Sequence, residues 1–503
     1  MLEREGRAFF LIPMGMDGAE PQRARQLTGA ELEAARLGFH RAHPHRSAKR
    51  VFYVTQLIAI VTLAAGFVLA LRAAPALTWA TVHYAALSFF AIAIFWRLIA
   101  ASNLKPLLWR LTSPAQWPTY TILCPLYREA GVVSELVAWL RRLDYPHEAL
   151  QILLLIEADD AETLTAASAV ANTAPFEVVL LPPAPPRTKP KALNAGLALA
   201  RGEFVVVYDA EDRPHPQQLR AALAAFEDGG ERLACVQAPL DVDNAEQSWI
   251  ARQFAAEYAI QFRELLPMLA KLRLPLPLGG SSNHFRIAAL RASGGWDPFN
   301  VTEDADLGYR LARDGYASGV IGTPTWEEAP ITLGAWVNQR TRWIKGHMQT
   351  WLVLMRDPLR CAREMGLAGF ASMQLMLAGG IIAAFAHGPL ALVVLVAALS
   401  PYQLLGMEDF VLALAGYSVA IFAALTACAL SNSLSHARAA LTMPFYWPLA
   451  SIAAWKALFE LVFRPHHWSK TRHGISQRQV MRAGSDQRSD ASSAPMALMS
   501  SSL

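Results

Sequence analysis

Long apolar runs lie on both sides of a less hydrophobic central region. Residues 51–71 and 77–99 are almost free of charge and follow one another closely. An apolar helix needs about 20 residues to cross a bilayer core of about 30 Å. The pattern therefore predicts a transmembrane hairpin over residues 49–100.

A second apolar block begins after the basic residues Arg356, Arg360 and Arg363. It contains candidate spans over residues 366–386, 390–405, 410–430 and 440–463, of which the second is short and is broken by Pro401. We therefore expect membrane helices over residues 366–463 and about six spans in the whole chain.

Basic residues indicate which side of the membrane the central region faces. Arg46, Lys49 and Arg50 precede the first hairpin, Arg97, Lys105 and Arg110 follow it, and its loop holds only Arg72. Because positive charges favour the cytosolic side, both flanks are expected in the cytosol. The pattern predicts a multi-pass protein of the inner membrane with a cytosolic central domain.

The central region, residues 116–346, alternates short β-rich runs with helical stretches. The expected strands are residues 120–126, 151–156, 177–181, 203–208 and 233–237, and the clearest expected helices are residues 132–143 and 192–200. Such alternation predicts an α/β domain with a mostly parallel sheet covered on both faces. Ligands of such sheets sit beyond the carboxyl ends of the strands.

Composition narrows the class of protein. The chain is 53% hydrophobic and only 17% charged, and its net charge is +4. It has no basic patch with interleaved aromatic residues, so we expect no nucleic acid partner. Its four cysteines are far apart, which favours neither a zinc site nor a disulfide framework.

The two ends of the chain differ from the rest. Residues 1–48 lack an apolar core followed by a cleavage site, so no secretory signal is expected. Within them, Thr28 and Glu31 have the spacing of a capping box, which predicts a helix over residues 28–40. We assign residues 1–48 no function. Residues 476–503 are rich in Ser, Arg and Gln without apolar periodicity and are expected to be disordered.

Three acidic clusters lie after expected strands or open an expected helix. They are Glu157, Asp159 and Asp160; Asp209, Glu211 and Asp212; and Glu303 with Asp304. One such cluster is more often a turn or a helix cap than a site. Their joint occurrence favours the displacement of a nucleoside diphosphate from an anomeric carbon, in which a hard cation neutralises the leaving group and a carboxylate deprotonates the attacking hydroxyl.

Within that chemistry the clusters have different expected roles. Asp209 and Glu211, two residues apart after a strand, are candidate ligands for Mg²⁺ or Mn²⁺. Asp304 is the candidate general base. The simpler alternative for Asp304 is an acid that merely favours the N-terminus of its helix.

The segment QRTRW places Gln339, Arg342 and Trp343 on one helix face. An aromatic ring next to an amide and a guanidinium suits a platform for a sugar and a phosphate. The alternative is an interfacial helix that Trp and Arg anchor at the bilayer surface.

In order from Cys124 to Trp343, the central region of about 230 residues contains the segments CPLYREA, LIEADD, KPKALNAG, YDAED, GGSSNHF, TED and QRTRW. With these spacings they resemble the processive synthases of glycosyltransferase family 2, which include the cellulose synthase catalytic subunit and the hyaluronan and chitin synthases. The resemblance implies a GT-A fold, a UDP-sugar donor and inversion at the transferred carbon.

The resemblance also implies roles for individual residues. Tyr127, Glu129 and Glu157 look like uridine contacts; Lys189 and Lys191 like nucleotide or sugar contacts; Asp209 and Glu211 like the metal and diphosphate motif; Glu303 and Asp304 like the catalytic pair; and Gln339, Arg342 and Trp343 like the acceptor platform. Two departures stand out. The usual D-x-D is here Asp-Ala-Glu-Asp, which leaves open whether Glu211 or Asp212 meets the metal, and Glu157 replaces a more usual Asp.

A C-terminal segment, HWSKTRHG from His467, is similar to the W-x-T-R/K-G segment with which chitin and hyaluronan synthases close over bound nucleotide. It implies that Trp468, Lys470, Thr471 and Arg472 cover the diphosphate, so residues 464–475 form a gating segment. A basic stretch that binds anionic lipid is the alternative. Just before it, Lys456 and Glu460 are one helical turn apart, which favours a mutual or snorkelling pair over a role in a sugar channel.

The expected function is transfer of a hexose or N-acetylhexosamine from a UDP-sugar to a growing β-linked polysaccharide, coupled to export. The expected partners are the donor, a glycan acceptor and the bilayer, and six spans leave room for an accessory or export subunit. The alternatives are transfer of one sugar to a polyprenyl phosphate or another lipid, or a non-catalytic scaffold. The Gln339-x-x-Arg342-Trp343 motif argues against transfer of a single sugar to a lipid. The intact carboxylates argue against a non-catalytic scaffold.

Overall fold

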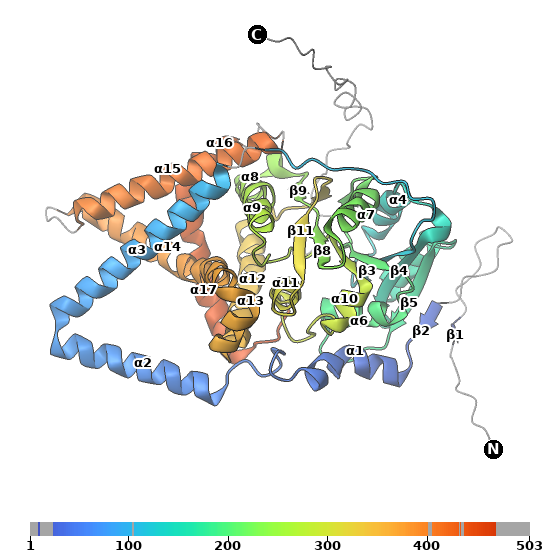
Figure 1. Ribbon diagram of the computed structural model, residues 1–503, viewed down its shortest axis with the longest axis horizontal. Helices are drawn as coiled ribbons and strands as arrows, with labels where there is room; N and C mark the ends of the chain where they lie inside the picture. Colours follow the sequence, from blue (N-terminus) through green and yellow to red (C-terminus); the bar gives the residue numbers. More distant parts are fainter. Residues whose placement is uncertain are drawn as a thin grey trace, which may run out of the picture.

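A nine-stranded sheet occupies the right-hand part of the molecule in Figure 1, opposite the long helices α2 Val54–Ala73, α3 Pro75–Ala101 and α15 Met407–Leu430. The computed structural model describes residues 9–10, 24–102, 105–400, 405–431, 433 and 437–468. Its strand order is β1-β2-β5-β4-β3-β6-β10-β8-β11. The strands are β1 Phe9–Phe10, β2 Ala24–Gln26, β3 Tyr120–Leu126, β4 Leu150–Glu157, β5 Phe176–Leu181, β6 Phe204–Val207, β8 Leu233–Gln237, β10 Asn283–Arg286 and β11 Ala317–Val320.

The sheet is mixed but mostly parallel. Strands β2, β5, β4, β3 and β6 run parallel to one another, and β8 runs parallel to β11. Strand β10 is antiparallel to both of its neighbours. The five predicted strands are all present, and the predicted GT-A-like fold class is confirmed.

Helices cover both faces of the sheet because buried side chains alternate along its strands. In β3, Ile122 and Cys124 join a cluster with α4 Val133–Leu140, α5 Ala161–Val170 and α7 Gln218–Gly229. Leu123 between them joins the opposite cluster, with α6 Lys189–Leu199, α9 Leu266–Lys271, α10 Ile287–Ala292 and α11 Glu303–Arg313. This alternation is what a two-sided sheet requires.

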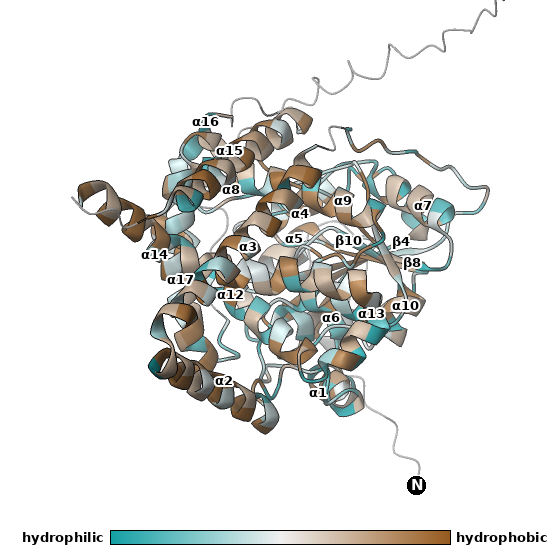
Figure 2. Cartoon of the chain, turned by 60° about the vertical axis from the view of Figure 1, so that its left-hand side comes forward, coloured by the Kyte–Doolittle hydropathy of each residue, from teal (hydrophilic) through white to brown (hydrophobic). Residues whose placement is uncertain are grey.

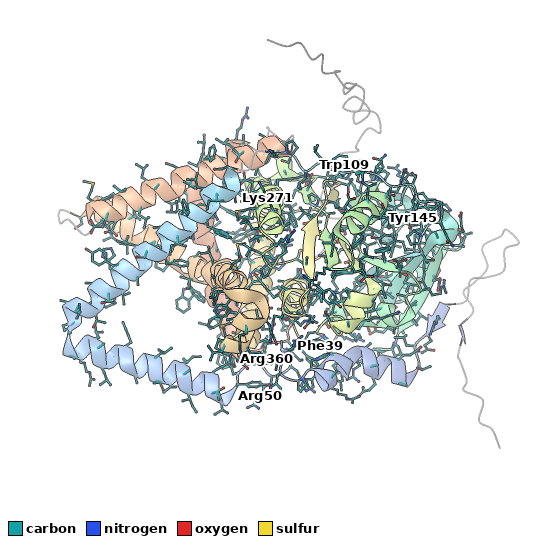
Figure 3. All side chains as sticks on the ribbon, in the orientation of Figure 1. Phe39, Arg50, Trp109, Tyr145, Lys271 and Arg360 are labelled. Carbon is teal, nitrogen blue, oxygen red and sulfur yellow. The ribbon has the colours of Figure 1, made fainter. Side chains whose placement is uncertain are left out.

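The N-terminal segment adds to this domain. The predicted capping box is present: Thr28 Oγ1 accepts from the Glu31 amide at 3.2 Å, and Glu31 Oε2 accepts from the Thr28 amide at 2.8 Å. Helix α1 Gly29–Ala42 follows, and β2 before it pairs with β5. Phe39 of α1, labelled in Figure 3, lies 4.5 Å from the Arg310 guanidinium of α11. Residues 24–42 therefore pack on the central domain.

A second, three-stranded sheet borders the same domain. Its order is β7 Arg213–Pro214, β12 Thr325–Glu327 and β9 Leu240–Val242. Helix α8 Trp249–Ala259 follows, and a π-helical turn, Ile260–Leu265, joins it to α9. These short strands have too few residues for a recognisable period-2 pattern.

Four helices of the described chain are long and apolar enough to cross a membrane. They are α2 Val54–Ala73, α3 Pro75–Ala101, the continuous run Pro358–Leu399 and α15 Met407–Leu430. Helices α2, α3 and α15 lie to one side of the sheet (Figure 1), and hydrophobic residues predominate along them (Figure 2). Helix α17 Met443–Phe463, which packs against this set, is not among the four.

The sequence prediction of separate spans at residues 366–386 and 390–405 is wrong. Helix α13 Pro358–Met373, a π-helical turn Gln374–Ala378 and α14 Gly379–Leu399 form one run with a kink at Gly366. Pro389 does not end the run. It cannot donate to the carbonyl of Phe385, and Ser451 Oγ of α17 reaches that oxygen at 3.3 Å and the Ala384 carbonyl at 2.6 Å.

Helix α12 Leu333–Leu354 carries the QRTRW segment and passes close to the start of α11. A Cβ atom at Gly346 would lie 2.4 Å from Thr302 Oγ1 and 2.8 Å from Thr302 Cβ. Only glycine therefore permits this approach between the helix with QRTRW and the residue that precedes Glu303.

Replacing Gly346 with Ala should force the two helices apart and lower the free energy of unfolding by about 1–3 kcal/mol. Gly334 lies in the same helix, and a Cβ there would meet nothing within 4 Å. Gly334→Ala should leave stability within about 1 kcal/mol of wild type or raise it. Thermal unfolding in detergent compares the two variants, and equal midpoints would show that the contact at Gly346 is unimportant.

Candidate active site

A cavity of about 460 Å³ lies at the carboxyl ends of β3, β4 and β6. The predicted site residues that line it are Tyr127, Glu129, Glu157, Lys189, Asp209, Glu211, Glu303, Asp304, Gln339, Arg342 and Trp343, together with Trp468. Lys191 lies behind the wall, and Lys470, Thr471 and Arg472 fall outside the described residues. The predicted site residues from Tyr127 to Trp468, which lie far apart in the sequence, thus line one cavity at the ends of the strands, where sheets of this kind bind ligands.

Glu157 ends β4 and is held by a buried lysine. Lys191 Nζ lies 2.5 Å from Glu157 Oε1 and donates to the Ala184 carbonyl at 3.2 Å. Burial raises the pKa of Glu157, and the Lys191 ammonium opposes that rise. Lys191 therefore positions Glu157 instead of facing the cavity. Nearby Arg187, which lines the cavity and pairs with Asp159 at 2.5 Å, was not predicted.

The three carboxylates of the Asp-Ala-Glu-Asp segment after β6 have two different surroundings. Asp209 and Glu211 line the cavity. Asp212 is 1% exposed; its Oδ2 accepts from the Asp209 amide at 2.8 Å and from the Ser281 hydroxyl. Asp212 therefore shapes the turn, and the arrangement favours Glu211 over Asp212 as the second cavity carboxylate.

Lys189 lies between the acidic clusters. Its Nζ is 2.5 Å from Asp209 Oδ1 and donates to the Gly280 carbonyl at 2.7 Å. Burial disfavours its charge, but Asp209 and the adjacent Glu303 and Asp304 outweigh burial and raise the pKa of Lys189. A fixed positive charge at this point suits a leaving diphosphate.

The donor set fits a divalent cation that also binds substrate oxygens. Within the described ranges, no three His, Cys, Asp or Glu residues are grouped to hold a metal by themselves. Mg²⁺ is commonly held by one or two carboxylates plus substrate phosphates. Asp209 and Glu211 match that arrangement, in which the donor diphosphate completes the coordination.

Glu303 and Asp304 open α11 and face the same cavity. Asp304 Oδ1 accepts from the Ala305 amide at 2.8 Å, and a Cβ at Gly280 would lie 3.3 Å from its Oδ2. Burial raises the pKa of Asp304, against the hydrogen bond from Ala305 and the charge of Lys189. Burial and the Asp304 charge raise the pKa of Glu303 to about 8. Of this pair, Glu303 is therefore the carboxyl that is largely protonated near neutral pH.

The predicted face of α12 does turn toward the cavity. Gln339, Arg342 and Trp343 all line it. The Arg342 guanidinium lies 4.9 Å from the ring of Trp468. Burial lowers the pKa of Arg342, and the carboxylates led by Glu303 oppose this. Arg342 is thus a second cation, besides Lys189, near the acidic clusters.

Sequence reasoning missed the contacts that hold Trp343. Arg340 donates to both carboxylate oxygens of Glu257, one of them at 2.7 Å, and its guanidinium lies 4.6 Å from the Trp343 ring. Tyr446 of α17 donates to Glu257 Oε2 at 2.9 Å. The ring of Tyr258 is stacked with the ring of Trp343, and the two ring centroids are 6.2 Å apart. These partners lie far apart in sequence, so spacing carried no signal of them.

Lys456 and Glu460 were expected to form a mutual or a snorkelling pair, and the first of these alternatives is wrong. Glu460 Oε2 lies 2.8 Å from Lys345 Nζ, and Lys456 Nζ donates to Asn338 Oδ1 at 2.6 Å. Both partners belong to α12, because α17 packs along that helix. Lys345 also donates to the His467 carbonyl at 2.7 Å, which helps to bring Trp468 to the cavity.

Comparison with known proteins supports the family-level prediction. Residues 204–450 match the family described as glycosyl transferase family group 2. This stretch contains the Asp209 cluster, Glu303 with Asp304, and the QRTRW segment. Together with the GT-A-like sheet, the match supports glycosyltransferase family 2 and does not single out its processive synthases.

Curated relatives are similar over about half of the chain. The probable glycosyltransferase YdaM of Bacillus subtilis is 26% identical over 262 residues, which are 49% of this chain and 59% of the relative. The beta-monoglucosyldiacylglycerol synthase of Synechocystis is 26% identical over 284 residues, which are 54% of this chain and 57% of the relative. The chain thus spans less than two thirds of the length of either relative.

A solved structure was also found. The mannosyltransferase PcManGT from Pyrobaculum calidifontis, in complex with GDP-Man and Mn²⁺, is 19% identical and gives a TM-score of 0.46, covering 72% of this chain and 97% of that chain. This structural similarity is too low to bear on function.

Proposed function

We propose that the protein is a membrane-associated, inverting glycosyltransferase that transfers one sugar from a UDP-sugar to the hydroxyl of a lipid acceptor. The observation that carries this proposal is the composition of the cavity wall. Lys189, Asp209 and Asp304 line one side, and Met376 and Leu377 of the apolar run Pro358–Leu399 line another. A polar donor side therefore meets a wall built by a candidate membrane helix.

In this proposal the polar side performs a single displacement. Asp304 accepts the proton of the acceptor hydroxyl, whose oxygen attacks the anomeric carbon as the bond to the diphosphate breaks. Lys189 and Arg342 stabilise the charge that develops on the leaving diphosphate. Asp209 and Glu211 would hold Mg²⁺ or Mn²⁺, which would add Lewis-acid stabilisation of that charge. One displacement inverts the configuration of the transferred carbon.

The relatives support a lipid acceptor over a polymer. The similar proteins of Synechocystis and Nostoc are named beta-monoglucosyldiacylglycerol synthases. A sugar-bearing lipid leaves the cavity along the membrane, so it needs no polymer channel. Four candidate spans accommodate such an enzyme without an export subunit. We place the catalytic domain on the cytosolic side of the inner membrane because basic residues flank the first hairpin.

Polysaccharide synthesis is the second candidate. It is favoured by Gln339, Arg342 and Trp343, which line the cavity as the resemblance to processive synthases implies. Trp468 over Arg342 also agrees with the gating segment of those enzymes. A polymer would have to pass the helices that surround the cavity.

Release of nucleoside diphosphate tests the proposal. The purified full chain in detergent is given UDP-sugars and GDP-sugars with Mg²⁺ or Mn²⁺, with and without diacylglycerol or polyprenyl phosphate. We expect one UDP-sugar to be turned over and one lipid to accelerate its turnover. Turnover that no lipid accelerates would contradict a lipid acceptor, and absence of turnover with every donor would favour the scaffold alternative.

A further inference from the structure

The wall of the cavity opposite the strand ends combines apolar groups with buried polar groups. Met376 and Leu377 belong to the π-helical turn Gln374–Ala378 of the longest apolar run. Tyr309 of α11 and His347 of α12 line the cavity with them. Such π-helical turns are rare and are frequent at functional sites.

Two polar atoms of this region lack a protein partner. Tyr309 is 0% exposed, and its hydroxyl has no hydrogen-bond partner among the described residues. Gln339 Oε1 is also buried and also has no hydrogen-bond partner among the described residues. Leaving buried donors and acceptors unsatisfied is costly, so atoms of this kind at a cavity wall indicate a ligand or ordered water.

The apolar part of this wall reaches into the membrane helices. Leu377 and Tyr309 share a buried cluster with Met373 and Leu354, so the apolar run packs directly on the helix that begins with the catalytic pair. His347 is uncharged at neutral pH, because burial and the charge of Arg340 lower its pKa to about 4. A neutral imidazole and a phenol suit a hydroxyl group, whereas two cations would suit a phosphate.

We propose that Tyr309 and His347 bind the uncharged, hydroxyl-bearing headgroup of a lipid acceptor whose acyl chains enter past Met376 and Leu377. This inference rests on the proposed function and adds the acceptor class and its route. The headgroup lies between the apolar turn and Asp304, and the acyl chains remain on the membrane side. Gln339 Oε1 accepts a hydrogen bond from a second hydroxyl of the headgroup or from the donor sugar.

Tyr309→Phe tests the headgroup contact, because it removes one oxygen and keeps the ring in its cluster. With a short-chain diacylglycerol as the probe, we expect the acceptor KM to rise about tenfold while the KM for the donor stays at its wild-type value. A variant whose acceptor KM equals that of wild type would overturn the role of Tyr309. A loss of thermal stability with both KM values unchanged would assign the hydroxyl a structural role.

Met376→Phe tests the route of the acyl chains, because it narrows the cavity at the apolar turn. Leu375→Phe is the matched control, since Leu375 is in the same turn and does not line the cavity. We expect the acceptor KM of Met376→Phe to be at least about five times that of Leu375→Phe. The increase should be larger for acceptors with long acyl chains than for acceptors with short ones. Equal values for the two variants would refute this route.

The outcomes separate this inference from the proposed function. If the wild-type chain shows no turnover that depends on lipid, the proposed function fails. If wild type uses diacylglycerol and the variants at Tyr309 and Met376 behave like it, only the acceptor subsite is wrong. Polyprenyl phosphate as a better acceptor than diacylglycerol would contradict the uncharged headgroup.

Discussion

Replacing Asp304 with Asn should lower kcat by about 10²- to 10⁴-fold, because an amide cannot take the proton of the attacking hydroxyl. Asp304 faces the cavity from the start of α11, and burial raises its pKa, which strengthens it as a base. Asn keeps the size of the side chain and can still accept from the Ala305 amide. The KM for the donor should therefore change little. Initial rates of diphosphate release at saturating donor and acceptor measure the effect.

Glu303→Gln is the matched control, since it changes the adjacent carboxyl on the same helix. A pKa of about 8 leaves Glu303 about nine-tenths protonated at pH 7, so Gln resembles its prevailing form. We expect kcat within about tenfold of wild type at pH 7. Above pH 8, wild type gains a second negative charge beside Asp304, and the variant does not. A larger loss of kcat in Glu303→Gln than in Asp304→Asn would show that Glu303, and not Asp304, is the general base.

Removal of divalent cations should abolish transfer, and Mg²⁺ or Mn²⁺ should restore it. Two carboxylates, Asp209 and Glu211, face the cavity, and a diphosphate without its cation would repel them. Glu211→Gln should raise the metal concentration needed for half-maximal rate by at least about tenfold, since one charged ligand is lost. The measurement is the rate during a metal titration after treatment with a chelator.

Asp159→Asn is the control for that titration. Asp159 is an acidic residue that follows β4 of the same sheet, pairs with Arg187 and does not line the cavity. The metal concentration that gives a half-maximal rate should be the same for Asp159→Asn as for wild type. Full activity of the wild-type chain in the presence of chelator would contradict the role of Asp209 and Glu211 and leave the cations Lys189 and Arg342 to stabilise the diphosphate alone.

Features that depend on local sequence were predictable. The buried strands and the acidic residues at their ends follow from runs of apolar residues and from where those runs stop. The spacing of Gln339, Arg342 and Trp343 predicted a shared helix face, and all three line the cavity. The capping box of Thr28 and Glu31 is equally local, and it is present.

Features that depend on packing between distant segments were not predictable. The contact of Arg340 with Glu257 and Tyr446 joins three helices, and no pattern along the chain marks it. Mutual pairing of Lys456 and Glu460 was one of two alternatives drawn from their one-turn spacing, yet each has a partner on α12. Separate spans were expected at residues 366–386 and 390–405, but the helix continues through Pro389, where Ser451 of another helix donates to the carbonyls of the preceding turn.

The mass of the product tests the central claim most directly. The full chain is incubated with the UDP-sugar that it turns over, Mg²⁺ or Mn²⁺ and diacylglycerol, and the lipid and aqueous phases are analysed by mass spectrometry. The account predicts a lipid that carries one sugar, with its anomeric configuration opposite to that of the donor. A long polymer in the aqueous phase, with no glycolipid, would contradict the account and establish the processive alternative.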